Sequence, residues 1–189
     1  MVVGQLLIGV DTACKAFPSV VYESSHILIG AATVIDVGAG RGRFARYFLR
    51  GEYRSGRYGV RAPVEFSVTE YVAVEPYFCN ELRKIRDPRL RVVCARWEDV
   101  REEYVNREFD MVILWNVLMF MPTDPYEVLK DMIHMARKFF LFSLYPVKSG
   151  TLPAEKFREV LLWLDTHPEL EVVSKKYFNR VYRIRRWPE

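Results

Sequence analysis

At 189 residues the chain is long enough for one domain with a complete core, and half of its residues are hydrophobic. The net charge of +4, from 28 basic and 24 acidic side chains, permits contact with nucleic acid without requiring it. Three widely spaced cysteines, Cys14, Cys79 and Cys94, predict neither a disulfide framework nor a zinc site, and we expect no bound metal.

The apolar segments 111–122 and 139–147 are too short to span a bilayer, and residues 1–10 lack the basic leader of a signal peptide. We therefore expect a cytoplasmic protein without membrane contact. Arginine occurs 20 times and glutamine once, a composition typical of a thermophilic source.

Residues 1–31 show no strong period. Asp11 or Thr12 is placed to cap a short helix, Pro18 would break that helix, and a second helical turn is expected over 22–29. We treat 1–31 as a helical segment that precedes the main domain.

Residues 34–44 carry the clearest pattern in the chain. The β-branched run 34–37 predicts a buried parallel strand. Three glycines follow at a spacing of two: Gly38, Gly40 and Gly42. An apolar helix face over 44–49 then ends at Gly51. A strand, a glycine turn and a helix in this order aim backbone N–H groups at the polar end of a ligand.

Asp36 lies within the predicted strand, where a buried carboxylate needs a partner. A dinucleotide-binding turn would place glycine or alanine three residues beyond Gly40. That position is Arg43, which argues against NAD. A glycine turn without any ligand is the alternative interpretation.

The order acid-x-Gly-x-Gly-x-Gly, from Asp36 to Gly42, closely resembles motif I of the S-adenosylmethionine-dependent methyltransferases with a Rossmann-like fold. The resemblance implies an α/β fold for 32–189: a three-layer sandwich around a mostly parallel seven-stranded sheet with a C-terminal antiparallel hairpin. It also implies S-adenosylmethionine as cofactor, with Asp36 supporting its ammonium group. The backbone at four positions would hold its methionine end: Gly38, Ala39, Gly40 and Gly42.

In such enzymes the segment before motif I often lies across the cofactor mouth. The resemblance makes 1–31 a candidate lid, with Phe17 and Tyr22 as lid residues. Ordinary packing of these aromatic rings against the sheet is the alternative, which we favour.

An insertion is predicted at about 52–68. From Gly42 to the next candidate acid, Glu75, is 33 positions, whereas about 20 is usual in such folds. The inserted stretch contains three arginines that could hold phosphate or nucleic acid: Arg54, Arg57 and Arg61. A solvated loop with locally paired arginines is an equal alternative.

Residues 70–75 predict the second strand, which ends at Glu75. A carboxylate at this tip can accept hydrogen bonds from both ribose hydroxyls, and the position matches motif II of the family. A helix-capping glutamate is the alternative. The apolar face of a helix follows over 78–85 and stops before Pro88.

The third strand is predicted over 90–95. The family places adenine contacts directly after it, often starting with an acid, but this chain has Arg96 there. Glu98 or Asp99 could replace that acid, and Trp97 could lie against the purine. A core position for Trp97 and a helix cap for Asp99 are the alternatives.

Residues 109–116 predict a buried strand that resembles motif IV, with Asn116 at its carboxyl end. Asn116 is therefore a candidate for both the cofactor and the acceptor. In small-molecule methyltransferases a Glu-His pair often follows, but Met119 and Phe120 occupy these positions. A general acid or base is thus missing from this loop, and the catalytic residues stay unknown.

The rest of the chain predicts a helix capped by Thr123 or Asp124, a strand over 138–145, a helix from Pro153 and a hairpin over 171–187. Tyr145, at the ligand end of its strand, is a second candidate on the acceptor side.

The resemblance, together with these patterns, implies an S-adenosylmethionine-dependent methyltransferase of undetermined oligomeric state. A small-molecule acceptor is favoured because no appended recognition domain is seen; RNA and protein stay open. The alternatives are a non-catalytic protein that binds the same cofactor and, less favoured, an NAD-dependent oxidoreductase.

Overall fold

The computed structural model describes residues 18–55, 58–145 and 152–185. These residues contain a seven-stranded sheet in the order β5-β4-β1-β6-β7-β9-β8. The parallel strands are β1 (Thr33–Val37), β4 (Glu70–Val74), β5 (Leu90–Val93), β6 (Phe109–Trp115) and β7 (Ala136–Ser143). The closing hairpin is β8 (Leu170–Lys176) and β9 (Asn179–Ile184), with β9 antiparallel to β7. The mostly parallel seven-stranded sheet with a C-terminal hairpin is confirmed.

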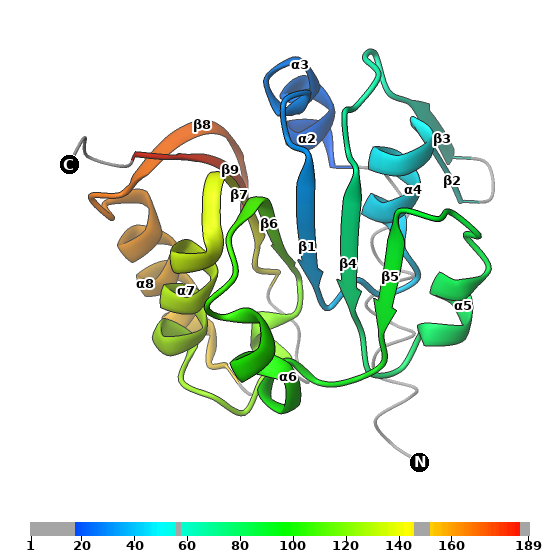
Figure 1. Cartoon of the computed structure of the whole chain (residues 1–189). Coiled ribbons are helices and arrows are strands. Elements are labelled where there is room, and N and C mark those ends of the chain that lie inside the picture. The colour runs from blue at the N-terminus through cyan, green and yellow to red at the C-terminus, as the bar shows by residue number, and fades with distance from the viewer. Residues whose placement is uncertain (1–17, 56–57, 146–151, 186–189) are drawn as a thin grey trace.

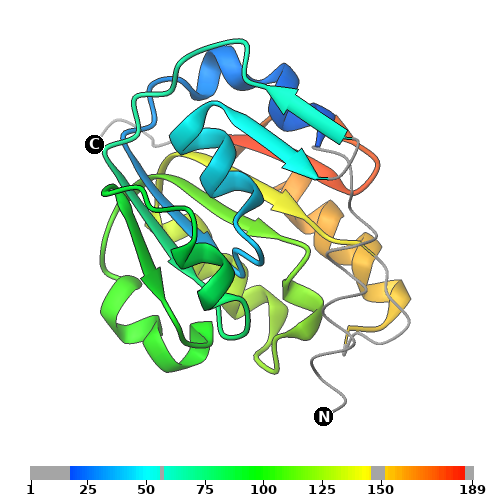
Figure 2. The same cartoon turned by 90° about the vertical axis from the view of Figure 1, so that its right-hand side faces the viewer.

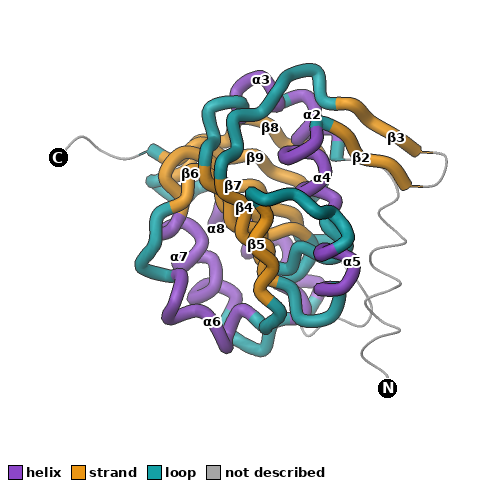
Figure 3. Tube along the Cα trace, turned by 45° about the vertical axis from the view of Figure 1, so that its right-hand side comes forward, coloured by secondary structure: helices purple, strands orange, loops and turns teal. Residues whose placement is uncertain are grey.

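Helices cover both faces of this sheet (Figures 1 and 3). One face carries α2 (Ser19–Glu23), α3 (Ser25–Leu28), α4 (Arg43–Arg50) and α5 (Cys79–Arg83). The other carries α6 (Trp97–Tyr104), α7 (Pro125–Met135) and α8 (Ala154–Asp165), and a short 3₁₀ turn, η1 (Leu118–Phe120), follows β6. The three-layer sandwich predicted from the sequence is therefore confirmed.

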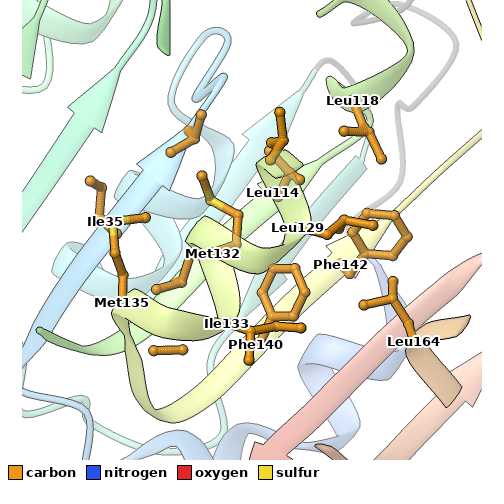
Figure 4. Close-up of a cluster of buried hydrophobic side chains, with 14 of the residues drawn as sticks. Ile35, Leu114, Leu118, Leu129, Met132, Ile133, Met135, Phe140, Phe142 and Leu164 are labelled. Carbon is orange, nitrogen blue, oxygen red and sulfur yellow. The ribbon is translucent and has the colours of Figure 1, made fainter. Parts of the chain in front are cut away.

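The sheet divides the hydrophobic core into two layers, because successive side chains of a strand point to opposite faces. In β1, Ile35 packs under α6–α8 while Val34 packs under α2–α5. Figure 4 shows the first layer, in which Met132 and Ile133 of α7 lie over the sheet. All seven residues of β6 are buried, which explains why six of them are apolar, and the exception, Asp110, forms an ion pair with Arg137.

Two predicted helix boundaries are found in the structure. The Asp124 side chain accepts a hydrogen bond from Tyr126 N at 2.7 Å, and Pro125 occupies the first helical position of α7. Gly51 ends α4 with φ +68° and donates its N–H to Tyr47 O. The start of α7 and the end of α4 are therefore explained by residues at the helix boundaries themselves.

The inserted stretch contains regular structure that the sequence analysis did not predict. β2 (Glu52–Ser55) and β3 (Tyr58–Arg61) pair antiparallel as a separate two-stranded sheet. Figure 2 shows this cyan hairpin beyond the end of α4. Because α4 is about 12 Å long at 1.5 Å per residue, the hairpin lies well away from the glycine turn that begins α4.

The segment before β1 is helical where it is described. Figure 1 shows α2 and α3 beside the end of the sheet at which β1 begins, opposite the glycine turn. Tyr22 lies on α2 and is 39% exposed. It is therefore not at the mouth of the turn, and its packing against the sheet stays a prediction. Phe17 lies outside the described residues.

The structure overturns the expectation that the cysteines form no disulfide. Cys79 and Cys94 form a disulfide, with their Cα atoms 5.7 Å apart. The spacing gave no sign of it because the pairing depends on β4 and β5 being neighbours, which brings the start of α5 to the end of β5. Cys14 lies outside the described residues.

Within the described ranges no helix is long and apolar enough to cross a membrane. The same residues hold no cluster of three or more His, Cys, Asp or Glu side chains suited to a metal ion.

Candidate ligand-binding site at the carboxyl edge of the sheet

The turn between β1 and α4 depends on glycine. Gly38 has φ +75° and donates its N–H to Val74 O at 2.8 Å, and a Cβ there would lie 2.5 Å from the Val117 side chain. Gly42, with φ +78°, is the N-cap of α4, and a Cβ there would lie 2.6 Å from Ile85. Larger residues at these two positions would be strained, because the turn lies tightly against the α5 segment and the loop after β6.

Glu75 follows β4 directly and is 5% exposed. Its Oε2 accepts a hydrogen bond from Gly40 N at 2.8 Å, and its Oε1 accepts from Tyr77 N at 2.8 Å and Phe78 N at 3.3 Å. The carboxylate therefore joins the glycine turn to the loop after β4. A carboxylate offers about four acceptor positions, so it can also accept from a ligand.

Asp36, the last residue but one of β1, is 1% exposed. Its Oδ2 accepts a hydrogen bond from the Tyr71 hydroxyl at 2.7 Å, while Oδ1 has no hydrogen-bond partner in the part of the chain that the structure describes. Burial raises the pKa of Asp36 to about 7, and the nearby Glu75 adds to the rise, whereas Tyr71 and Arg43 oppose it. A cation that reached Oδ1 would satisfy this buried oxygen.

The start of α6 follows β5 at the same edge. Trp97 is 3% exposed and packs in the core layer under α6–α8, so the structure favours the core interpretation over stacking on a purine. Glu98 is half-buried, and its Oε1 has no partner among the described residues. Arg96 is exposed and donates to the Tyr77 hydroxyl at 3.4 Å. Glu98 is thus the better adenine candidate of the two predicted.

A polar cluster lies where β6, β7 and β9 meet this edge. Ser143 Oγ lies 2.7 Å from Asn116 Oδ1 and 2.7 Å from Asn179 Oδ1. A hydroxyl has one proton, so Ser143 donates to one amide and accepts from the NH₂ group of the other. Asn116 is 8% exposed and has φ +57°, an uncommon conformation for a residue other than glycine.

Aromatic side chains stand beside this cluster. Tyr145 is 52% exposed, and its ring meets the Phe178 ring edge-on with centroids 6.1 Å apart. Tyr177, in the β8–β9 turn, is 83% exposed. The cluster Asn116–Ser143–Asn179 and these rings form the side of the edge that lies away from β4 and β5.

The loop after β6 supplies no acid or base where the family often has one. Met119 is fully buried, and Phe120 packs against the same core layer. The three histidines of the chain lie towards the opposite end of the sheet: His26 on α3 before β1, His134 at the end of α7 before β7, and His167 before β8.

The three arginines of the insertion are not placed at this edge. Arg61 is exposed on β3, at the far end of α4 from the glycine turn. Arg54 belongs to β2, whose backbone alone is described at that point, and Arg57 lies outside the described residues. Their contact with phosphate or nucleic acid stays a prediction.

The structure thus brings Asp36, the glycine turn, Glu75, Glu98 and Asn116 to one edge of the sheet. Sequence reasoning missed three residues of the site: Tyr71, Ser143 and Asn179. Tyr71 could have been found, because Asp36 pairs with Ala73 in the neighbouring strand and residues two apart share a face. The other two depend on the β7–β9 register, in which Ser143 pairs with Asn179.

No protein-family model matches the sequence, and no curated protein matches it in sequence. Solved structures do resemble the fold. The magnesium protoporphyrin IX methyltransferase of Synechocystis PCC 6803, crystallised with S-adenosylmethionine, is 13% identical with a TM-score of 0.57, over 95% of this chain and 79% of that one.

Two further structures extend this resemblance. A Staphylococcus aureus protein provisionally assigned as a caffeoyl-CoA O-methyltransferase is 8% identical with a TM-score of 0.61, over 88% of this chain and 81% of that one. A Clostridium thermocellum protein provisionally assigned as an rRNA methylase is 10% identical with a TM-score of 0.52, over 88% and 94%. At such identities the likeness shows the fold alone: the Rossmann-like fold of these methyltransferases.

Proposed function

We propose that this chain is an S-adenosylmethionine-dependent methyltransferase. The proposal rests on two buried carboxylates that flank the glycine turn. Asp36 has an Oδ1 without a partner among the described residues, and Glu75 accepts a hydrogen bond from Gly40 N. Asp36 Oδ1 suits a cation, and the remaining acceptor position of Glu75 suits a hydroxyl donor. The fold likeness agrees with this assignment.

The residues present fit the cofactor. Asp36 Oδ1 would take the ammonium group of the methionine end, next to the backbone of Gly38, Ala39, Gly40 and Gly42. Glu75 has about one acceptor position left beside its three backbone donors and would use it for a ribose hydroxyl. Glu98, with its buried unpartnered Oε1, would meet the adenine.

The cofactor supplies a methyl group already activated by the positive charge on sulfur. The protein must then hold the acceptor in line with that methyl group and keep water out. We assign the acceptor side to Asn116, held by Ser143, and to the exposed ring of Tyr145. These groups are neutral hydrogen-bonding and aromatic groups, suited to orienting an acceptor rather than to taking its proton.

A small-molecule acceptor is the form of the proposal that we favour. The basic hairpin β2–β3 lies at the far end of α4, so it does not add to the rim of this site. The Synechocystis neighbour is named for a small-molecule substrate, and the Clostridium neighbour for an RNA. Both kinds of acceptor therefore belong in the activity test.

A protein that binds the cofactor without transferring methyl groups is the second candidate. The fully buried Met119 favours it, because this position often carries a carboxylate in the small-molecule enzymes that the chain resembles. Transfer from methyl-labelled S-adenosylmethionine into fractionated cell extract separates the two: label in any fraction shows an enzyme, and binding without label in any fraction favours the non-catalytic candidate.

Calorimetric titration with S-adenosylmethionine, S-adenosylhomocysteine and NADH is the first experiment. We expect micromolar binding of the first two, about −8 kcal/mol, and at least tenfold weaker binding by Glu75→Ala. The matched control is Glu81→Ala, which removes an exposed carboxylate on α5 that pairs with Lys84. Binding of NADH alone, or no heat with any of the three, would contradict the proposal.

A further inference from the structure

The Cys79–Cys94 disulfide lies beside the proposed cofactor site. Cys79 begins α5, one residue after Phe78, whose N–H donates to Glu75 Oε1. Cys94 follows β5 and precedes Arg96 by two residues. The disulfide therefore links the loop that holds Glu75 to the loop that leads to Glu98.

The two cysteines differ in their exposure as whole residues. Cys94 is exposed, whereas Cys79 is 8% exposed. A thiolate arriving from solvent would therefore attack Cys94 Sγ and release Cys79 as the leaving thiolate. Direct access to one sulfur of a pair is what thiol–disulfide exchange requires.

The reduced state has a partner ready for the buried sulfur. Cys79 Sγ lies 2.9 Å from the carbonyl oxygen of Glu75. In the disulfide this sulfur has no proton to donate, but as a thiol it can donate to that oxygen. Cys79 thus has one bond available in each redox state, to Cys94 or to the backbone of Glu75.

We propose that Cys79 and Cys94 form a redox-active pair, a site of exchange with a dithiol reductant that controls the order of the Glu75 loop. The first thiolate of the dithiol forms a mixed disulfide with Cys94 and displaces Cys79, which takes up a proton. The second thiol then releases Cys94 and closes the disulfide of the reductant. Two electrons and two protons pass from the dithiol to the pair.

Reduction removes the covalent link between the loops after β4 and β5. In the reduced state the segment that carries the amides of Tyr77 and Phe78 is held to Glu75 by hydrogen bonds only, without the covalent restraint at Cys79. Looser backbone here means a less preorganised carboxylate, so ligand affinity falls on reduction. This last consequence rests on the proposed function, whereas the change in backbone order does not.

The experiment compares oxidised protein with protein treated with dithiothreitol under native conditions. Peptide mapping without reduction should yield a cross-linked Cys79–Cys94 peptide that dithiothreitol removes. Amide hydrogen exchange at Tyr77 and Phe78 should become about tenfold faster in the reduced protein. Absence of the cross-linked peptide, resistance to dithiothreitol in the folded protein, or unchanged exchange would each overturn the proposal.

Two variants make the comparison specific. Cys94→Ser should exchange rapidly at Tyr77 and Phe78 with or without dithiothreitol, whereas Cys14→Ser should keep the full response of the natural protein. A response that persists in Cys94→Ser would overturn the proposal.

Titration of the oxidised and the reduced protein with S-adenosylhomocysteine tests the effect of reduction on ligand affinity. Affinity at least threefold weaker in the reduced protein supports the proposal. Equal affinity in both states would contradict the expected fall in ligand affinity on reduction. No binding in either state overturns the proposed function, and hydrogen exchange then decides the redox proposal by itself.

Discussion

The backbone amide of Gly40 donates to Glu75 Oε2 across 2.8 Å, although 35 positions separate the two residues in the chain. This bond fastens the turn after β1 to the end of β4. The same carboxylate accepts from Tyr77 N and Phe78 N. Glu75 is therefore a structural residue as well as the proposed ribose ligand, and the two roles can be separated by substitution.

Glu75→Gln should destabilise the protein even without ligand. The amide keeps one oxygen, but its NH₂ group must face Gly40 N or Tyr77 N, which are also donors. We expect a loss of about 1–3 kcal/mol in the free energy of unfolding, measured by urea denaturation. Glu81→Gln, at an exposed pair, should change it by no more than about 0.5 kcal/mol. Equal values for the two variants would mean that these bonds contribute nothing.

Asp36 should make the stability depend on pH. Its pKa is raised to about 7 by burial, above the ordinary value of 3.8, so between these two pH values the folded state holds a proton that the unfolded state has lost. The free energy of unfolding should therefore fall as pH rises from 4 to 7, by a few kcal/mol at most. Asp36→Asn should remove this slope in urea denaturation at pH 5 and pH 8.

The same ionisation should govern ligand affinity with the opposite sign. A cationic ammonium binds the charged carboxylate, so S-adenosylhomocysteine should bind more tightly as pH rises through about 7. Tyr71→Phe removes the hydrogen bond that lowers the pKa of Asp36 and should move this rise to higher pH. An affinity that stays constant from pH 5.5 to 8.5 in the natural protein would show that Asp36 does not meet the ammonium group.

The glycine turn should tolerate alanine unequally. Gly38→Ala combines φ +75° with a Cβ 2.5 Å from the short, branched Val117 side chain, and should cost about 2–4 kcal/mol. Gly40→Ala at φ +56° meets no atom within 4 Å and should cost about 1 kcal/mol. Gly30→Ala, which meets none and has no positive φ, is the control. Thermal denaturation ranks the stabilities of the three variants. A Gly38→Ala variant that is no less stable than Gly40→Ala would refute the close contact with Val117.

The parts of the fold that could be predicted have local causes. The buried β6 is apolar at every position but Asp110, and α7 begins with a capping Asp124 before a proline. The hairpin β2–β3 was missed because its strands are four residues long, and no residue of the main sheet pairs with them. Short strands outside the main core leave little periodicity in the sequence.

The candidate site also contains residues that local sequence patterns predict and residues that they do not. Asp36 and Glu75 could be predicted because Asp36 lies in a strand with a clear apolar pattern and Glu75 directly follows another such strand. The three glycines also mark the turn that follows the strand of Asp36. Trp97 could not be assigned, because a residue at the first turn of a helix can face either the core or the cleft. The Cys79–Cys94 pair and the Ser143 cluster depend on which strands are neighbours, which local patterns do not specify.

Ser143 should be needed to hold the acceptor side in place. Ser143→Ala leaves the amides of Asn116 and Asn179 without the hydroxyl that joins them, at a cost of about 1–3 kcal/mol for buried polar groups. Ser143→Thr keeps the hydroxyl on a residue that suits a strand, so it should retain most of the stability. Because Asn116 already has φ +57°, losing its hydrogen bond with Ser143 Oγ should also loosen its backbone, visible as faster amide exchange at Asn116 in Ser143→Ala and not in Ser143→Thr. Affinity for S-adenosylhomocysteine should change less than twofold in both variants, since the cluster belongs to the acceptor side; a tenfold loss in Ser143→Ala would instead assign Asn116 to the cofactor.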